Sequence, residues 1–236
     1  MYLTHQDLIG NLWVNQEEQF NGIDDDNNGF IDDIHGYNFE FNNNNLQDTN
    51  SHGTQVGGIA AAVTNNRVGV AGTCWNCKVM VLKFIEVDGY FEDAARAIQY
   101  ATDNDVRITS NSYGSSEFSN VLQDAINYAH NSGLIIVAAA GNANTDEPTY
   151  PAAMQNVVAV AATNETNHKT TFSNYGNWVD ISAPGYNILS TRVGGGYGES
   201  DGTSMATPFV SGLAALILSQ EPYLTNEDVE KIIKFS

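Results

Sequence analysis

The order of apolar and helical segments most constrains the fold of this chain. Five apolar runs have the composition of buried strands: residues 78–84, 106–112, 134–140, 157–163 and 179–183. Helical patterns occupy residues 54–63, 91–102, 120–131, 204–219 and 226–234. Parallel strands need helical crossovers, and those helices cover both faces of the sheet. The sequence therefore predicts an α/β fold, a three-layer sandwich with a mainly parallel central sheet flanked by helices.

The length of the chain indicates how many domains it has, and its net charge excludes some classes of partner. The 236 residues fit one domain, and we interpret the Asn- and Asp-rich first fifty as its surface loops. Asp and Glu number 28 against 9 Lys and Arg, a formal charge of −19. Such a chain is repelled by nucleic acids and by anionic membranes, so we expect neither as a partner. No apolar stretch reaches the ~18 residues of a membrane span.

Small polar residues follow two of the predicted strands. Ser112 ends one strand and is followed by Tyr113 and Gly114, and Gly141 and Asn142 come after the next strand. Ligands bind parallel α/β sheets at the carboxyl ends of the strands. We therefore expect these two segments to lie together at a binding site. The alternative for Asn142 is a simple turn residue.

Two further segments place reactive side chains at the start of predicted helices. Residues 202–208 read GTSMATP, with Ser204 entering an apolar helix, and residues 51–58 read SHGTQVGG, with His52 opening a helix of small residues. A serine there has unpaired backbone N–H groups beside it, which an oxyanion can use. The alternative is a helix cap. The small residues of the second segment predict close packing of its helix.

Together these strings resemble the motifs of the subtilase family of serine proteases. The segments YPA (150–152), FSNYG (172–176) and VDISAPG (179–185) extend the resemblance over nearly the whole chain. The resemblance implies a serine endopeptidase with Ser204 as nucleophile, His52 as general base and Asn142 in the oxyanion hole. It also implies that Ser112, Tyr113, Gly114 and Gly141 bind the peptide substrate.

The aspartate of the family's triad has no counterpart here. The family places it in Asp-Ser/Thr-Gly followed by four variable residues and His-x-Asp-Leu, and residues 5–8 (HQDL) match only the second half. We therefore expect residues 1–236 to be a single subtilase catalytic domain that lacks the aspartate strand before Met1 and is also shortened at its C-terminus. We expect this chain alone to be inactive. The alternative function is a peptide-binding pseudoprotease.

Two loops are candidate calcium sites. The first has oxygen ligands at calcium-loop spacing, and the second resembles a calcium loop of the family. The first set is Asp24, Asp26, Asn28, Phe30, Asp32 and Asp33; the second is Asp7, Thr64, Asn66, Val68 and Val70. The alternative for the first loop is a solvated acidic turn. We expect calcium in a structural role.

Cys74 and Cys77 form a Cys-x-x-Cys pair, which is compatible with a redox motif, half a zinc site, two thiols or a loop disulfide. Residues 1–5 do not resemble a signal peptide. The family resemblance implies secretion, polypeptide substrates and an N-terminal propeptide in the full-length protein. We also expect a monomer.

Overall fold

The computed structural model describes residues 1–86 and 88–235. The helices are η1 (Ile9–Asn11), α1 (His52–Ala61), α2 (Phe91–Asp103), α3 (Asn120–Asn131), α4 (Thr203–Gln220) and α5 (Asn226–Phe235). The strands are β1 (Gly36–Asn38), β2 (Val81–Lys83), β3 (Ile108–Asn111), β4 (Ile135–Ala139), β5 (Val157–Thr163), β6 (Ile181–Pro184), β7 (Ile188–Thr191) and β8 (Tyr197–Ser200).

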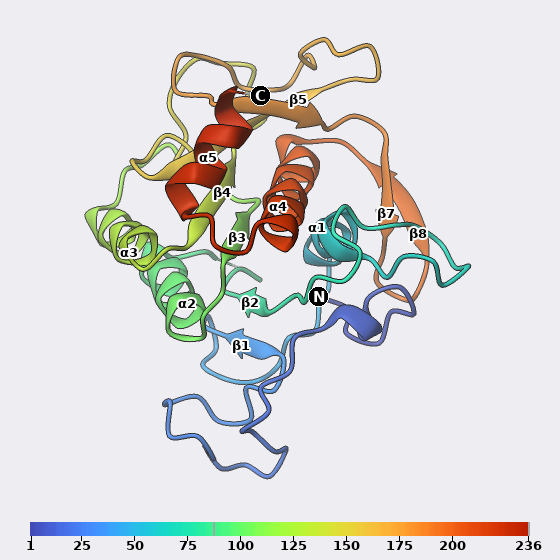
Figure 1. The fold of residues 1–236 in the computed structure, drawn as a ribbon, viewed down its shortest axis with the longest axis vertical. Helices are drawn as coiled ribbons and strands as arrows, with labels where there is room; N and C mark the ends of the chain where they lie inside the picture. The colour runs from blue at the N-terminus through green and yellow to red at the C-terminus, as the bar shows by residue number, and fades with distance from the viewer. Residues whose placement is uncertain (87, 236) are drawn as a thin grey trace.

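A parallel sheet in the order β3-β4-β5-β6 forms the centre of the molecule. Its side chains alternate between two cores. Ile136 and Ala138 of β4 pack with α2 and α3, whereas Ile135 and Val137 pack with α4 and α5. Figure 1 shows the two pairs of helices on either side of the strands. This arrangement confirms the predicted three-layer α/β fold.

The sheet is interrupted between β2 and β3. Strand β2 pairs with β1 on one side and β3 pairs with β4 on the other, but β2 and β3 do not pair with each other. A cavity of about 750 Å³ separates them and is lined by residues of both strands. We call this cavity the slot. Within the part of the chain that the structure describes, one edge of each bordering strand is therefore without a strand partner.

The predicted strand at residues 78–84 is shorter in the structure, where β2 covers only Val81–Lys83. The preceding Val79 makes an isolated bridge with Leu12, exchanging backbone hydrogen bonds with the segment at η1. Strands β1, β7 and β8 were not predicted. Each has only three or four residues, too few for a clear apolar pattern.

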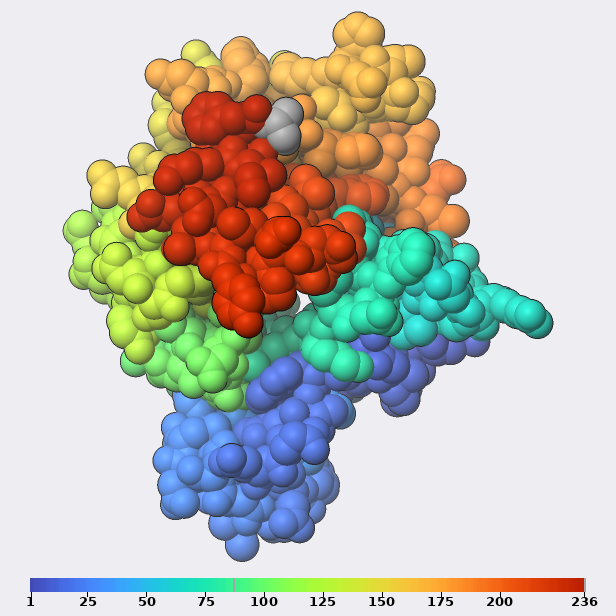
Figure 2. Space-filling view, viewed as in Figure 1, coloured from blue at the N-terminus to red at the C-terminus, as the bar shows by residue number. Residues whose placement is uncertain are grey.

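The lower lobe in Figure 2 is formed by part of the first fifty residues. These residues contain more regular secondary structure than predicted. They contain η1 and β1 as well as loops. Phe39 is fully buried against Tyr100 of α2, with ring centroids 5.6 Å apart. This aromatic contact joins the lobe to the main domain.

Candidate active site

Ser204 is the second residue of α4 and is half-buried. The chain enters the helix through Gly202, whose φ of 146° is a conformation that favours glycine. Pro208 has no N–H, so the carbonyl of Ser204 lacks its usual helical donor. The hydroxyl of Ser112 donates to that carbonyl at 2.9 Å, and the Ser204 hydroxyl donates to the Ser112 carbonyl at 3.3 Å. These bonds join the end of β3 to the start of α4.

Asn142 follows β4 and faces the same helix terminus. Both the backbone N–H and the hydroxyl of Thr203 donate to the Asn142 side-chain oxygen, at 2.9 and 3.0 Å. The Asn142 amide nitrogen has no hydrogen-bond partner within the described residues, so it can donate to another molecule. Gly141 has a φ of 101°, and a Cβ there would lie 2.6 Å from Nδ2 of Asn174. Only glycine fits this position without displacement.

These residues surround a cavity of about 450 Å³, which we call the Ser204 cavity. Its lining includes the following predicted site residues: Ser112, Tyr113, Gly114, Gly141, Asn142 and Ser204. The backbone groups of Gly114 form no hydrogen bond within the described chain, whereas Ser115 is bridged to Tyr150. The segment before this bridge can therefore pair with an extended peptide.

His52 is the first residue of α1 and lines the slot. Ser112 and Tyr113 line both the slot and the Ser204 cavity, so the two spaces meet beside them. The structure shows no hydrogen bond between the His52 ring and Ser204. His52 is exposed as a whole, but burial of its ring against protein atoms lowers its pKa from 6.5, and the negative charge of Asp48 opposes this shift.

Asp48 is not free to act as a partner of the His52 ring. Its carboxylate accepts the backbone N–H groups of Asn50, Ser51 and Thr54 and the hydroxyl of Thr54, at distances of 2.6 to 3.0 Å. It therefore caps α1, which begins two residues before the predicted start at Thr54. No described carboxylate forms a hydrogen bond with the His52 ring.

Helix α1 packs closely on β7, as its small residues predicted. A Cβ on Gly58 would clash with the hydroxyls of Ser190 and Thr191. Those hydroxyls donate to the carbonyls of Gln55 and Thr54, at 2.8 and 2.7 Å. The contact fixes the helix that carries His52.

Asn174 holds the backbone around Asn142 in place, a role that was not predicted from the sequence. Its Nδ2 donates to the Ala140 carbonyl at 2.9 Å, and its Oδ1 accepts the N–H of Ala143 at 2.8 Å and of Thr145 at 3.3 Å. Asn174 thus holds the chain on both sides of Asn142. Its segment FSNYG resembles the family pattern, which was the available signal.

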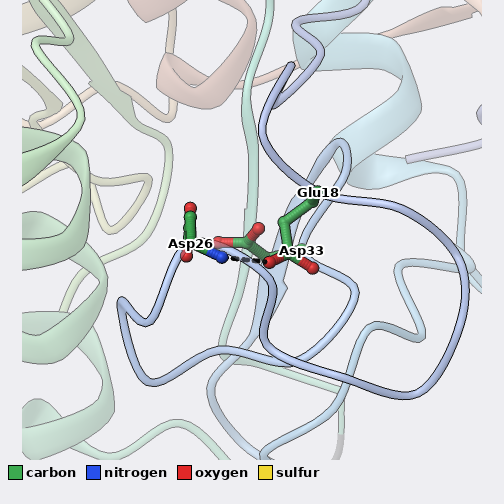
Figure 3. Close-up of side chains that lie close together, drawn as sticks. All are labelled: Glu18, Asp26 and Asp33. Atoms are coloured by element: carbon green, nitrogen blue, oxygen red, sulfur yellow. Dashed lines mark hydrogen bonds between the residues drawn. The ribbon is translucent and has the colours of Figure 1, made fainter.

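The acidic loop brings three carboxylates together. Single oxygens of Glu18, Asp26 and Asp33 lie within 4.8 Å of one another, and Figure 3 shows the side chains converging. Glu18 and Asp33 are buried. Among the described residues their hydrogen-bond donors are neutral: the amides of Asn15 and Asn28, the Tyr100 hydroxyl and backbone N–H groups. Three hard oxygen ligands without a cationic partner fit a calcium ion.

The cluster differs from the predicted ligand set. It contains Asp26 and Asp33 and adds Glu18, which the sequence did not indicate. Asp24 and Asp32 lie outside it because their carboxylates accept turn amides: Asn28 and Gly29 for Asp24, Asn21 and Gly22 for Asp32. The Asn28 side chain donates its amide to the cluster, at 3.0 Å to Asp26 and 2.9 Å to Asp33.

Phe30 belongs to the aromatic core of this lobe. Its ring lies 4.9 Å from the rings of Tyr37 and Tyr100, measured between centroids. The role of its backbone carbonyl as a calcium ligand stays a prediction.

The second candidate loop contains a single carboxylate. The buried Asp7 accepts the Asn66 amide at 2.6 Å, the Val70 N–H at 2.9 Å and the Tyr197 hydroxyl at 3.0 Å. Thr64 donates its hydroxyl to the Ala62 carbonyl, and the Val68 N–H donates to Asn66. The structure therefore brings Asp7 and Asn66 together, whereas the backbone carbonyls of Thr64, Val68 and Val70 stay predicted ligands.

Cys74 and Cys77 form a disulfide, with Cα atoms 5.5 Å apart. Of the alternatives open from the sequence, the loop disulfide is the one observed. Within the described residues, no helix is both long and apolar enough to cross a lipid bilayer.

The site can be compared with known proteins. The sequence profile of peptidase S8, the Subtilase family, matches residues 3–236. The "Thermophilic serine proteinase" of Bacillus sp. (strain AK1) is 44% identical over 79% of this chain, and thermitase of Thermoactinomyces vulgaris is 43% identical over 79%. This chain spans 47% of the first protein's length and 68% of thermitase.

Solved structures agree with the sequence relatives. A cold-adapted subtilisin-like serine proteinase superposes with a TM-score of 0.83 at 28% identity, covering 99% of this chain and 77% of the other. Sphericase gives a TM-score of 0.81 at 31% identity, covering 99% and 78%.

Proposed function

Because the chain belongs to the subtilase family, we propose that it is the catalytic part of a serine endopeptidase. Ser204 is the nucleophile, His52 the general base and Asn142 the oxyanion-hole side chain. Residues 1–236 form one catalytic domain, and its substrates are polypeptides. The observation that carries this proposal is the convergence of the Ser204 hydroxyl, the start of α4 and the unpartnered Asn142 amide on one cavity.

In the proposed reaction, the Ser204 oxygen attacks a peptide carbonyl while His52 takes its proton. The carbonyl oxygen becomes an oxyanion, to which the Asn142 amide and the Ser204 N–H donate. His52 then returns the proton to the leaving amine, and the peptide bond breaks to give an acyl-enzyme. Water then attacks the ester carbonyl while His52 takes a proton from it, and His52 returns that proton to the Ser204 oxygen as the acid product leaves.

For this reaction the Ser204 hydroxyl must rotate from the Ser112 carbonyl toward the His52 ring. It donates at 3.3 Å to the Ser112 carbonyl, a long hydrogen bond that costs little to exchange. Catalytic hydrogen bonds are often absent or long without substrate and tighten when substrate binds. Extended substrate pairs with the backbone at Ser112–Gly114 and places its scissile carbonyl near Asn142.

His52 also needs a carboxylate to fix its tautomer and to balance its charge when protonated. We propose that a strand seated in the slot supplies it. The slot is bordered by two strands with free edges and is lined by His52, so a strand between β2 and β3 can both pair and approach the ring. This aspartate belongs to the Asp-Ser/Thr-Gly segment expected upstream of Met1.

We also propose that Glu18, Asp26 and Asp33 bind a structural calcium ion. The support is their proximity, their burial and their neutral surroundings. The ion would offset two of the three negative charges and thereby hold the loops of the lower lobe to Tyr100, whose hydroxyl donates to Asp33 at 2.6 Å. We propose the Asp7 loop as a second calcium site, one that offers a single carboxylate.

The rival function is a peptide-binding pseudoprotease. The observation in its favour is that the His52 ring has no hydrogen bond to Ser204 or to a carboxylate within the described chain. A fluorophosphonate probe separates the two, because it labels only an activated serine. We expect labelling in a version extended upstream of Met1 to include Asp-Ser/Thr-Gly, and none in the same version with Ser204→Ala. An unlabelled extended version that still binds peptides would establish the rival.

Secretion, an N-terminal propeptide and a monomeric state remain proposals from family membership. Size-exclusion chromatography with light scattering tests the last of these.

A further inference from the structure

We propose that Glu147 makes this site selective for a basic side chain immediately before the cleaved bond. The inference rests on the proposed function, because it assigns a specificity to the same Ser204 cavity. Glu147 and Ser204 line one cavity of about 450 Å³, which therefore holds an acidic residue and the reacting serine in its wall.

Glu147 is the only charged residue in the lining of this cavity among the described residues. The remaining lining is neutral, for example Ser116, Thr145 and Thr149. The Glu147 carboxylate forms no hydrogen bond or ion pair within the described chain. A cationic side chain that enters the cavity therefore meets one negative charge that is not already neutralised.

Lys169 is a cation that contacts the same loop at Asn144, and its ammonium group is engaged by that loop and its neighbours. Its ammonium group donates to the Asn144 side chain at 2.8 Å and to the carbonyls of Thr170 and Ser173 at 3.0 Å. It also lies 5.0 Å from the ring centroid of Tyr175. Lys169 fixes the loop without neutralising Glu147.

The backbone around Glu147 is held in place. The Thr145 N–H donates to Asn174, the Tyr175 N–H donates to the Thr145 carbonyl at 3.0 Å, and the Trp178 indole donates to the Asp146 carbonyl at 2.9 Å. The Glu147 N–H donates to the Thr145 hydroxyl at 3.2 Å. This fixed backbone keeps the Glu147 side chain at the wall of the cavity, so that less ordering is needed when a ligand binds.

Lysine and norleucine are a matched pair for this test, since their side chains have similar apolar stems and differ in the ammonium group. We would measure their dissociation constants by calorimetry, using the 236-residue chain with Ser204→Ala and hexapeptides that carry either residue before the scissile bond. Because Glu147 is exposed, the charge interaction is partly screened. We expect the lysine peptide to bind about two- to fivefold more tightly, and less so at high salt.

Glu147→Gln should abolish this preference while leaving the affinity for the norleucine peptide unchanged. Asp146→Asn is the matched control: it makes the same change in net charge one residue away, at a side chain outside the cavity lining, and should keep the preference. Equal binding of the two peptides by the parent, or an unchanged preference in Glu147→Gln, would overturn the inference.

Failure to bind either peptide would overturn it as well. Fluorophosphonate labelling of Ser204 in the extended version then tells whether the proposed hydrolytic site survives. Labelled protein without a lysine preference refutes the specificity alone, whereas unlabelled protein refutes the proposed activity.

Discussion

At the scale of single residues, His52 is shaped by two opposing effects. Protein atoms around the ring disfavour the imidazolium and lower its pKa, while the charge of Asp48 favours the imidazolium. Burial is the larger effect. A lowered pKa keeps the ring neutral at lower pH, and the neutral imidazole is the form that can accept the Ser204 proton.

We predict that His52 titrates with a midpoint below 6.5 in the folded chain, which can be measured by NMR of its ring protons. Asp48→Asn should lower the midpoint further because it removes the favourable charge. The unfolded state binds the proton at higher pH than the folded state, so the contribution of His52 to stability is present above pH 6.5 and is lost as pH falls through the folded pKa. A midpoint at or above that of the urea-unfolded chain would contradict this account.

At the scale of elements, the sequence predicted those helices and strands whose apolar pattern is continuous along the chain. The ends of β5 and α3 match the expected ranges of 157–163 and 120–131, because a buried parallel strand is continuously apolar and an amphipathic helix has a clear period. Motif strings likewise identified the residues that surround the Ser204 cavity. Short strands such as β7 carry too little pattern to be predicted.

Such local patterns could not predict contacts between residues that lie apart in the sequence. Glu18 joins Asp26 and Asp33 because its carboxylate accepts the N–H groups of Asp25, Asp26 and Asp32, at 2.6 to 3.2 Å. The predicted ligands instead followed the spacing of a single loop. Asn174 was missed for the same reason: the chain that it holds lies about thirty residues earlier.

We predict that calcium raises the melting temperature of the parent chain and that Glu18→Gln loses most of this increase. Binding to the folded state alone contributes about 2.7 kcal/mol at a hundredfold excess over Kd. Asp24→Asn is the control, because Asp24 is an acidic residue of the same loop outside the cluster. Differential scanning calorimetry in calcium and in chelator measures the effect. Equal melting temperatures in the two buffers would remove the proposed site.

At the scale of the whole molecule, the slot divides the sheet into two parts. Strand β2 belongs with β1 and the lower lobe, whereas β3 belongs with the larger sheet. Backbone groups on the facing edges have no strand partner among the described residues. Each such group costs about 1–3 kcal/mol when it is also kept from water. The volume of about 750 Å³ leaves room for water, which reduces this cost but does not pair the two halves.

The last prediction is that residues 1–236 alone form a folded domain that is inactive as a protease. Without a carboxylate on His52, the imidazole has no fixed tautomer and the imidazolium has no counter-charge; replacing that aspartate by asparagine in another serine protease lowers kcat by about 10⁴. We therefore expect fluorophosphonate to label Ser204 about 10³- to 10⁴-fold more slowly in this chain than in the version extended upstream of Met1.

The extended version should also melt at higher temperature, because its added strand pairs with both β2 and β3. An extended version with Asp→Asn in the Asp-Ser/Thr-Gly segment separates the two effects, since it should keep the higher melting temperature and label slowly. Equally fast labelling of residues 1–236 and the extended version would show that the slot is not the source of the missing carboxylate.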